Sequence, residues 1–349
     1  MRGEPADRSE AVPPRTRLAD IARHADVSEA TVSRVLNDKP GVSAATRQAV
    51  LMSLDILGYD RPSRLKRKSA GLVGLIVPEL TNPIFPAFAQ VIETSLAKSG
   101  YTPVLCTETP GGAHEDEYVQ MLIDRGVSGI IFVSGLHADT TQSSQRYVAL
   151  REQGLPVVFV NGYLDGVDAP FISSDDRAAI SLATSHLLTL GHTRIGLAIG
   201  PARYVPVIRK TARFRQVMRE AGADDIDLLV EHSMFTVEGG AAAAGLLIAR
   251  GATAIVCGSD VMALGAIRAA RGAGLRVPQD VSVVGYDDSP LVAFTDPPLT
   301  TIRQAVGGMG EAAVHALLAE ISGTPGTHAE YFFEPELVLR GSTAVAPRR

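Results

Sequence analysis

The sequence lacks the patterns that mark export, membrane insertion or disulfide cross-linking. The first 17 residues hold no apolar stretch of the kind found in signal peptides, and no apolar run approaches the ~18 residues that span a bilayer. The two cysteines, Cys106 and Cys257, each end an apolar run and share no local spacing, which indicates buried thiols in a reducing compartment. We therefore expect a cytoplasmic protein with no membrane partner, and these absences argue against an exported solute-binding protein.

Signatures of catalysis, cofactor binding and metal binding are absent as well. The sequence has no Ser/His/Asp constellation, no phosphate-binding Walker loop and no cysteine cluster. His186 and His192 stand six residues apart, and Gly191 ends the helix before the second histidine, so we expect structural roles for both. The sequence thus predicts a binding protein without cofactor or metal, rather than an enzyme.

Charge is distributed unevenly along the chain. The net charge of the 349 residues is −5, yet residues 1–70 carry 13 Lys and Arg against 9 Asp and Glu. The positive excess is greatest in "RPSRLKRK", residues 61–68, where five cations stand without an acid. Such a run is either a solvated linker or a segment that contacts nucleic-acid phosphates, and the sequence before it favours the second interpretation.

Residues 16–60 have the pattern of three short helices, after a polar, proline-rich tail at 1–15 that we expect to be disordered. Ser28 and Ser43 are candidate N-caps of the second and third helices, and Gly58 follows the third. The apolar positions at helical spacing are Leu18, Ile21, Ala22 and Ala25, then Val32, Val35 and Leu36, then Val50, Leu54 and Leu57. This arrangement predicts a helix-turn-helix module, although a purely structural helical hairpin has a similar pattern.

The second helix of such a module enters the major groove of DNA, and its first residues face base edges. Here those residues are Glu29 and Ala30, with Arg34 one turn further on the same face. Arginine can bind guanine O6 and N7 together, and glutamate can accept from the cytosine amine. Glutamate at this position also suits the helix dipole, while it repels phosphate. We predict DNA contacts from Ser28, Glu29, Ala30, Thr31, Ser33, Arg34 and Asn37, with the short hydroxyl side chains at phosphates.

From residue 71 onward, short apolar runs alternate with amphipathic segments. Runs such as "LVGLIV", "GIIFV" and "PVVFV" are typical of parallel strands that helices cover on both faces. The alternation restarts near residue 191, where "GHTRIGLAIG" is similar to the first start at "SAGLVGLIVP". Because these strands and helices are too numerous for one comfortable doubly wound sheet, we predict two similar α/β lobes.

These motifs together resemble the lac repressor (LacI/GalR) family of bacterial transcription regulators. The likeness begins in "LADIARHADVSEATVSRVLN" and continues in order through "GLIVPELTNPIF", "RGVSGIIF", "HLLTLGHTRIG", "GSDVMALGAIRA", "GLRVPQDVSVVGYDDSP" and "PPLTTIRQ". The resemblance implies a DNA-binding headpiece, a hinge, and a two-lobed core like that of periplasmic sugar-binding proteins. It also implies a homodimer that represses transcription at a pseudo-palindromic, double-stranded operator and responds to a small polar effector such as a sugar.

The resemblance also divides the chain into segments. We expect a tail at 1–15, the headpiece at 16–60, a basic hinge at 61–70, an effector-binding and dimerisation core at 71–343, and a tail at 344–349. Within the core, lobe 1 should take about 71–172 and 303–331, and lobe 2 about 173–302 and 332–343. No leucine heptad like that of tetrameric family members follows "RGST", so we expect a dimer.

Two positions depart from the family pattern. Asp26 stands where the helix-turn-helix usually has glycine, and aspartate tolerates the left-handed conformation better than most residues. In the hinge, the place of the family's minor-groove leucine falls near Ser69, and the link to the core is shorter. We expect phosphate contacts from Arg64, Lys66, Arg67 and Lys68, with Leu65 as a weaker wedge candidate.

The resemblance places the effector between the lobes, where strand ends and their loops converge. Asn82 would bind a polar group and Phe85 would stack on a ring face, unless Phe85 packs in the core. Asp260 and Asp287 follow strands, and their carboxylates suit adjacent hydroxyls, although each could instead cap the next helix.

Two further segments complete the expected effector site. Lys210 aligns with the family's ligand-clamping arginine, and a lysine offers a point charge where arginine offers a fork. Gln304 lies at a crossover between the lobes, where it would touch ligand or serve as a hinge. The predicted effector-binding residues are Asn82, Phe85, Arg209, Lys210, Ser259, Asp260, Asp287 and Gln304.

Overall fold

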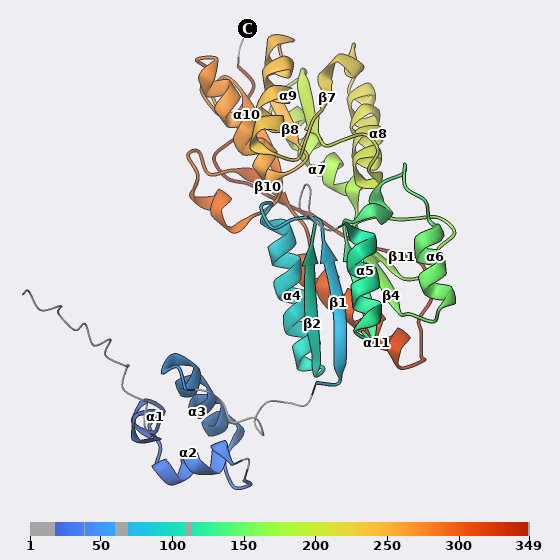
Figure 1. Ribbon diagram of the computed structural model, residues 1–349. Helices are drawn as coiled ribbons and strands as arrows, with labels where there is room; N and C mark the ends of the chain where they lie inside the picture. Colours follow the sequence, from blue (N-terminus) through green and yellow to red (C-terminus); the bar gives the residue numbers. More distant parts are fainter. Residues whose placement is uncertain (1–17, 38, 60–68, 109–113, 348–349) are drawn as a thin grey trace, which may run out of the picture. The chain divides into compact units, whose positions relative to one another are not determined.

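The computed structural model describes residues 18–37, 39–59, 69–108 and 114–347 (Figure 1). The chain divides into two compact units between Ser69 and Ala70. The first unit is helical, and we call it the headpiece. The second unit, which we call the core, contains two six-stranded sheets, each covered by helices.

The headpiece consists of α1 (Leu18–His24), α2 (Glu29–Leu36) and α3 (Ala44–Ile56). Asp26 adopts a left-handed φ of 51° in the turn before α2, as expected for aspartate in the place of glycine. Ser28 caps α2 by accepting from the Thr31 backbone N–H at 3.2 Å, and Ser43 caps α3 in the same way. The buried apolar side chains are Ile21, Ala22, Val32, Val35, Leu36, Val50 and Leu54. The prediction of a helix-turn-helix is confirmed.

Lobe 1 of the core is a six-stranded parallel sheet with strand order β11-β5-β4-β3-β1-β2. Helices α4 and α11 pack together on one face, and α5 and α6 cover the other. The elements of lobe 1 are β1 (Gly71–Val77), α4 (Ile84–Lys98), β2 (Tyr101–Thr107), α5 (Glu115–Asp124), β3 (Gly129–Val133), η2 (Leu136–Ala138), α6 (Gln145–Glu152), β4 (Val157–Val160), β5 (Phe171–Ser174), α11 (Val306–Ile321) and β11 (Glu330–Phe333).

Lobe 2 repeats this topology with strand order β12-β10-β9-β8-β6-β7. Helices α7 and α8 cover one face, and α9 and α10 cover the other. The elements of lobe 2 are α7 (Asp176–Thr189), β6 (Ile195–Ile199), α8 (Val205–Glu220), η3 (Ile226–Leu229), β7 (Val230–His232), α9 (Val237–Ala249), β8 (Ala254–Cys257), α10 (Asp260–Gly272), β9 (Ser282–Asp287), η4 (Pro290–Phe294), β10 (Thr300–Arg303) and β12 (Glu336–Val338). The prediction of two similar lobes is confirmed.

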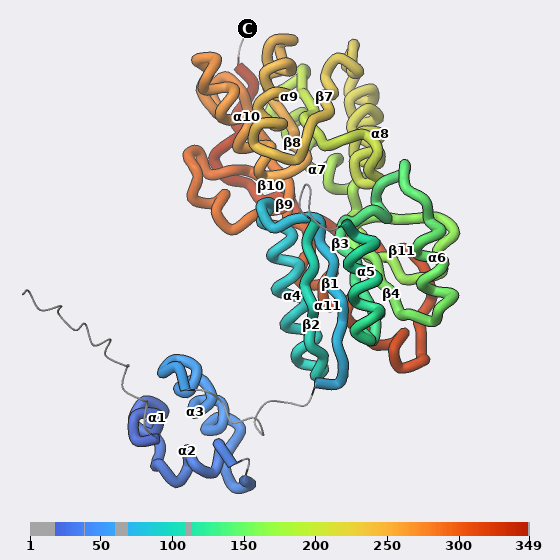
Figure 2. The backbone as a smooth tube through the Cα atoms, viewed as in Figure 1, coloured from blue at the N-terminus to red at the C-terminus, as the bar shows by residue number. Residues whose placement is uncertain are grey.

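The chain passes between the lobes three times, and its path can be followed in Figure 2. The crossings lie between β5 and α7, between β10 and α11, and between β11 and β12. As a result α7 follows a strand of lobe 1 but packs in lobe 2, and α11 does the reverse. The last crossing is nearly straight, so β11 runs parallel to β5 whereas β12 runs antiparallel to β10.

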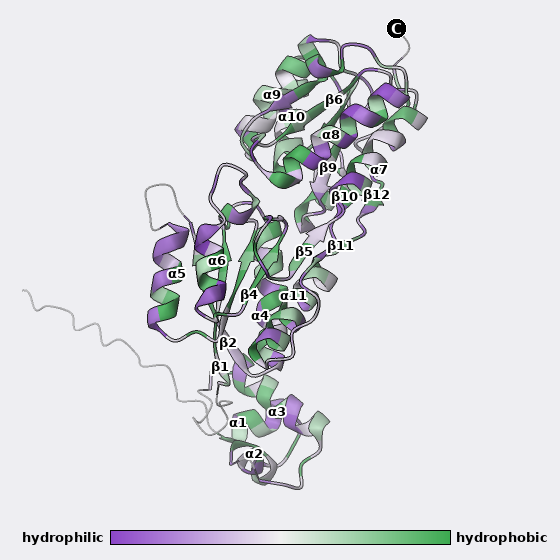
Figure 3. Cartoon of the chain, turned by 90° about the vertical axis from the view of Figure 1, so that its right-hand side faces the viewer, coloured by the Kyte–Doolittle hydropathy of each residue, from purple (hydrophilic) through white to green (hydrophobic). Residues whose placement is uncertain are grey.

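The inner strands of each sheet are buried because helices cover both faces. In β3, Ile131 and Val133 pack toward α4 and α11, while Ile130 and Phe132 pack toward α5 and α6. Figure 3 shows the same pattern, with hydrophobic colour along the strands near β4 and hydrophilic segments on α5 and α6. Continuous apolar runs are the sequence pattern that this burial requires.

Three expected borders need correction. β5 extends to Ser174 and β11 to Phe333, past the expected lobe borders at 172 and 331. Part of the expected C-terminal tail is bonded to lobe 2, because the Ala344 N–H donates to Ser282 Oγ at 3.0 Å. The Ala346 N–H also donates, at 2.9 Å, to the carbonyl of residue 190. None of the helices in the described residues has the length and hydrophobicity that a membrane crossing requires.

Candidate DNA interface and interlobe cleft

One side of α2 carries the residues that we predicted to face DNA bases. Glu29, Ala30 and Arg34 are exposed, whereas Val32 and Val35 on the other side are fully buried in the headpiece. Burial of the valines holds the helix against α1 and α3 and leaves the charged side available.

The short polar side chains of α2 already bond within the helix. Ser28 Oγ and Thr31 Oγ1 lie 3.0 Å apart, so the capping hydroxyl is also tied to its neighbour. The Asn37 amide donates to the Ser33 carbonyl at 2.7 Å and to the Ser33 hydroxyl at 3.3 Å. These bonds fix the side-chain conformations, and each oxygen keeps lone pairs for a further partner.

The basic segment at 61–68 is the other part of the chain that we predicted to contact DNA. Arg64, Leu65, Lys66, Arg67 and Lys68 lie outside the described residues.

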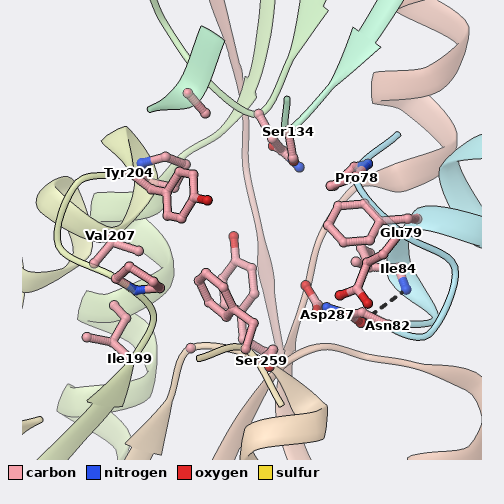
Figure 4. Close-up of a pocket in the computed structure, with 18 of the residues that line it drawn as sticks. Pro78, Glu79, Asn82, Ile84, Ser134, Ile199, Tyr204, Val207, Ser259 and Asp287 are labelled. Atoms are coloured by element: carbon pink, nitrogen blue, oxygen red, sulfur yellow. Dashed lines mark hydrogen bonds between the residues drawn. The ribbon is translucent and has the colours of Figure 1, made fainter. Parts of the chain in front are cut away.

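A cavity of about 640 Å³ lies between the two lobes of the core (Figure 4). Both lobes supply its walls. The lining that we discuss comprises Glu79, Asn82, Phe85, Glu108 and Asn161 of lobe 1, and Arg203, Tyr204, Lys210, Ser259, Tyr286 and Asp287 of lobe 2, with Gln304 at the crossover. A cavity of this volume at the carboxyl ends of parallel strands is the usual form of a small-molecule site in an α/β protein.

The start of α4 forms part of the lobe 1 wall. Asn82 is buried, and its Oδ1 accepts from the Ile84 backbone N–H at 3.4 Å. Phe85 is half-buried, and it both lines the cavity and packs against the lobe 1 core. The two alternatives for Phe85 therefore do not exclude each other.

A chain of polar side chains crosses the floor of the cavity from lobe 1 to lobe 2. Asn161 Nδ2 donates to Gln304 Oε1 at 3.2 Å, and Gln304 Nε2 donates to Asp287 Oδ1 at 2.8 Å. Burial raises the pKa of the Asp287 carboxyl well above its usual range, Asp260 adds to the rise, and the Gln304 and Asn82 hydrogen bonds oppose it. Gln304 is thus both a lining residue and a connection between lobes.

Lys210 reaches the cavity from α8, as its alignment predicted. Its side chain is buried, Nζ lies 3.0 Å from Asp176 Oδ1, and the ammonium stands 3.7 Å from the centre of the Tyr286 ring. Burial opposes the charge of Lys210, but Asp176 and the acidic groups beside it raise its pKa above the usual value. Lys210 is therefore a charged group that is already paired and stacked.

Arg209 and Asp260 were also predicted to bind the effector, but the structure does not bring them into the lining of the cavity. Arg209 points away and forms a two-point ion pair with Glu330 at 2.7 and 2.8 Å. Asp260 is buried behind Ser259, where it accepts from the Thr301 hydroxyl and the Ser289 N–H, each at 2.6 Å. Both side chains turn toward partners that are distant in sequence, which the local pattern cannot reveal. Ser259, not Asp260, caps α10.

A direct contact between lobes was not predicted. Asp139 Oδ2 accepts from Arg203 Nε at 2.7 Å, and the carbonyl of Arg203 accepts from the N–H and hydroxyl of Thr140 at 2.9 and 2.8 Å. We call Asp139, Thr140 and Arg203 the interlobe clasp. No local motif marks these residues.

The loop that carries Asp139 is held from behind by a buried acid. Glu115 Oε2 accepts from the Leu136 N–H at 3.0 Å, and Glu115 Oε1 accepts from the Tyr147 hydroxyl. Burial raises the pKa of Glu115 to about 7, although both hydrogen bonds oppose the rise. The clasp therefore rests on a fixed loop in lobe 1.

Other lining residues were missed for different reasons. Asn161 directly follows β4 and Asp176 lies two residues after β5, so the strand-end rule that selected Asp287 could have selected them too. Tyr204 and Tyr286 carry no pattern that separates a cavity wall from a core. His192 is buried between Thr253 and Ser282, and in the described residues no group of three or more His, Cys, Asp or Glu is placed to hold a metal ion.

Comparison with known proteins gives both parts of the chain a family. Residues 17–62 match bacterial regulatory proteins of the lacI family, and residues 184–343 match the periplasmic binding protein-like domain. The chain is 66% identical over 337 residues to the HTH-type transcriptional regulator reg1 of Streptomyces lividans, which covers 95% of this chain and 98% of the relative. It is 32% identical over 336 residues to the transcriptional repressor CytR of Escherichia coli K12, which covers 95% and 97%.

Solved structures agree along nearly the whole chain. A transcriptional regulator CelR–cellobiose complex has a TM-score of 0.71 at 31% identity, and the comparison covers 94% of this chain and all of that one. The lac repressor dimer bound to operator and the anti-inducer ONPF has a TM-score of 0.69 at 28% identity, with 94% and 99% covered. The chain belongs to the LacI family of bacterial transcription regulators.

Proposed function

We propose that this regulator represses transcription as a homodimer on a pseudo-palindromic operator, and that a sugar-like effector in the interlobe cavity controls it. The observation that carries this proposal is the cavity of about 640 Å³, walled by both lobes and floored by the Asn161, Gln304 and Asp287 chain. A ligand that bonds to this chain would bind both lobes at once and so favour one relative arrangement of them. The neighbours that bind cellobiose and ribose support a sugar as the ligand.

The headpiece would read the operator through α2. Glu29, Ala30 and Arg34 would face base edges, because they share the exposed side of the helix. Ser28, Thr31, Ser33 and Asn37 would set the register at phosphates and sugars. Arg64, Lys66, Arg67 and Lys68 would contact phosphates, and Leu65 would act as a weak minor-groove wedge.

In the cavity, Asn82, Lys210, Ser259, Asp287 and Gln304 would bond to hydroxyl groups. Phe85 would lie against the apolar face of a sugar ring. A difference in effector affinity between two lobe arrangements, worth ~1–3 kcal/mol, would change operator affinity about 5- to 150-fold. The protein would act by binding in the cytoplasm and not by catalysis.

The test of this proposal has two steps. Fragments of genomic DNA that the purified full chain retains in vitro are sequenced to give the operator, and we expect two half-sites about one or more helical turns apart. Sugars that raise the melting temperature of the chain are then added to the operator complex, and we expect one of them to change operator affinity. Retention of DNA without any common sequence would contradict the proposal, as would a stabilising sugar that leaves operator affinity unchanged.

Glu29 offers a test of base reading alone. Glu29→Gln removes a charge that repels phosphate but keeps a side chain of the same size, so we expect a changed base preference in the half-site. The slope of binding against salt concentration should change little, because Glu29 is not expected to displace counterions. A uniform effect on all operator sequences would show that Glu29 acts only on the helix terminus, and Glu311→Gln on an exposed face of α11 is the control.

A further inference from the structure

Two successive residues at the end of β9 have a positive φ. Asp287, the last residue of the strand, has a φ of 117°, and Asp288, which follows it, has a φ of 58°. Aspartate tolerates the left-handed conformation near 58°, but a residue with a Cβ rarely adopts a φ of 117°. Because such a backbone conformation costs free energy, it persists only where neighbouring contacts hold it. Contacts close to Asp287 must therefore hold its backbone.

The side chain of Asp288 bonds to two arginines, one through each oxygen. Its Oδ2 accepts from Arg303 Nε at 2.7 Å, and its Oδ1 accepts from Arg340 Nη2 at 2.6 Å. Arg303 ends β10, and Arg340 lies two residues after β12. The Asp288 side chain is only 9% exposed, so solvent screens these ion pairs weakly. We call Asp288, Arg303 and Arg340 the Asp288 cluster.

The two arginines of the Asp288 cluster are themselves fixed to lobe 2. The backbone N–H of Arg340 donates to Thr300 Oγ1 at 2.9 Å, and Arg340 Nη1 donates to the Leu299 carbonyl at 2.8 Å. Arg303 Nη1 donates to Glu336 Oε2 at 2.9 Å. Arg303 stands where the second crossing between the lobes begins, and Glu336 stands where the third crossing ends. The cluster thus ties the end of β9 to strands that cannot move independently of the sheet.

The strained residue next to the cluster carries a carboxyl group into the cavity. Asp287 lines the cavity, and its Oδ1 accepts from Gln304 Nε2 at 2.8 Å. On the other side of Asp288, the Ser289 N–H donates to Asp260 Oδ2 at 2.6 Å. The backbone that leaves Asp287 is therefore held by the side chain of one following residue and by the N–H of the next.

We propose that Asp288 is a positioning residue for the effector, because the Asp288 cluster holds Asp287 in its unfavourable backbone conformation and so directs its carboxyl group into the cavity. The inference rests on the proposed function, and it adds a residue that does not line the cavity. Without the cluster, the backbone of Asp287 would relax and its carboxyl would leave its place beside Gln304. A binding group that is fixed in advance loses less conformational freedom when the ligand arrives.

The first experiment measures the strain at position 287 without any ligand. Glycine adopts a positive φ without penalty, whereas alanine keeps the penalty, and both lack the carboxyl group. In full-length protein unfolded with urea, we expect the folding equilibrium constant of Asp287→Gly to exceed that of Asp287→Ala by about 10-fold, the reverse of the usual order. The advantage of glycine should disappear when each change is combined with Asp288→Gly, because the backbone has then relaxed.

The second experiment measures binding. Full-length parent and variants are titrated by calorimetry with ribose, glucose, cellobiose and further mono- and disaccharides. For a sugar that binds the parent, Asp288→Gly should weaken binding about 10-fold, because a charged hydrogen-bonding group is displaced. Glycine adopts the φ of Asp288 freely, so this loss must come from the missing carboxyl. Asp288→Asn should weaken binding less, because asparagine keeps one acceptor oxygen for one arginine, and it gives the same test at smaller amplitude if the glycine variant does not fold.

The matched control removes an arginine–aspartate pair elsewhere in lobe 2. Arg276 Nε lies 2.9 Å from Asp280 Oδ2 in the connection between α10 and β9. Arg276→Met should leave both the glycine advantage at position 287 and the affinity for the sugar unchanged.

The outcomes separate the inference from the function on which it rests. Equal stability of Asp287→Gly and Asp287→Ala would show that position 287 is not strained, and a glycine advantage that persists beside Asp288→Gly would show that the cluster does not hold the strain. Unchanged sugar affinity in Asp288→Gly and Asp288→Asn would reduce Asp288 to a stabilising ion pair and leave effector control intact. If no sugar bound the parent, the proposed sugar effector would fall, and the positioning role would fall with it.

Discussion

Helices α4 and α8 occupy equivalent places in the two lobes but present different chemistry to the cavity. Each follows the first strand of its lobe. Each also packs against a helix that the chain enters directly from the other lobe: α4 packs against α11, which follows β10 of lobe 2, and α8 packs against α7, which follows β5 of lobe 1. Yet α4 buries Ile84, Phe88, Ile92 and Leu96, whereas α8 buries Lys210 among its apolar residues. The shared topology determines where each helix lies beside the cavity, and the individual side chains determine what each helix can bind.

The difference follows from what lies beneath each helix. Under α8, the first turn of α7 places Asp176 next to Lys210, so a buried charge finds a partner. Under α4, the neighbouring helix offers Met309 and Ala313, and the contact is apolar. Lobe 2 therefore carries a buried ion pair at a position where lobe 1 carries hydrophobic packing.

Loss of Lys210 should have the largest effect on this contrast. Lys210→Met leaves Asp176 buried without its cation, and we expect a loss of about 3–5 kcal/mol in the free energy of unfolding, measured with urea. The double variant with Asp176→Asn should recover much of that loss, because no unpaired charge remains.

Arg219→Met, on the exposed side of the same helix, is the control for Lys210 and should change stability by less than ~0.5 kcal/mol. If the Lys210→Met variant were as stable as the parent, the Lys210–Asp176 pair would contribute nothing to stability, and the contrast in energy between α8 and α4 would be contradicted.

Glu115, the buried acid that holds the Asp139 loop of lobe 1, offers a second contrast with the cavity walls, because within the described residues it has no cation as a hydrogen-bond partner in the way that Asp176 has Lys210. The pKa of Glu115 is raised to about 7 from a value near 4.5, so its contribution to stability is fully present below about pH 4.5 and is lost as pH rises through about 7. We expect a loss of about 3 kcal/mol over that range, from the size of the shift. Unfolding free energies at several pH values, for the parent and Glu115→Gln, measure it. Parallel curves for the two proteins would contradict the assignment.

The interlobe clasp tests whether the lobes act as separate bodies. Asp139→Asn removes the charge that holds Arg203, whose side chain is 45% exposed, so global stability should fall by less than ~1 kcal/mol. The distribution of distances between dyes on the two lobes, measured by single-molecule fluorescence, should broaden toward longer values. Glu152→Gln changes an exposed acid of lobe 1 and should leave the distribution of distances unchanged. If the Asp139→Asn and Glu152→Gln variants gave the same distribution, the clasp would not hold the lobes together.

The smallest effect is expected at the far end of lobe 1. His328 bonds to Asp168 at 2.6 Å and to Glu320 at 2.7 Å, and although burial opposes the charge, these acids raise its pKa above 6.5. Its stabilising contribution is present below about pH 6.5 and is lost as pH rises through the raised value. Solvent screening keeps this contribution below ~1 kcal/mol. His328→Gln should remove this part of the pH dependence, and a titration of the His328 ring by NMR with an unshifted pKa would refute it.

The sequence predicted the long elements and missed the short ones for a physical reason. The runs at β1, β3 and β4 are apolar because helices cover both faces, and that burial leaves a clear pattern. The strands "TTIR" of β10 and "ELV" of β12 are only four and three residues long and contain no continuous apolar run of the length seen in β1, and they exist because each has a neighbour to pair with. Pairing of this kind is not visible along the chain.

The candidate site shows the same division. Asn82 and Asp287 could be predicted because strand ends and the loops after them fix where their backbones lie, whereas Lys210 was predicted by its alignment with the family's ligand-clamping arginine. Side-chain direction could not be predicted, since Arg209 turns toward Glu330, more than a hundred residues further along. The same limit hid Arg203, whose partner is in the other lobe.

The last crossing segment has a consequence for biosynthesis. Lobe 1 begins at β1 but is completed by β11, so its sheet cannot finish until residue 333 has been made. At ~5–20 residues per second, synthesis from the end of β5 to that point takes roughly 8–30 s, during which the edge of β5 stays unpaired. The headpiece is contiguous and can fold first. A ribosome that stalls within this window would therefore release a chain able to fold its DNA-binding module but unable to close either lobe.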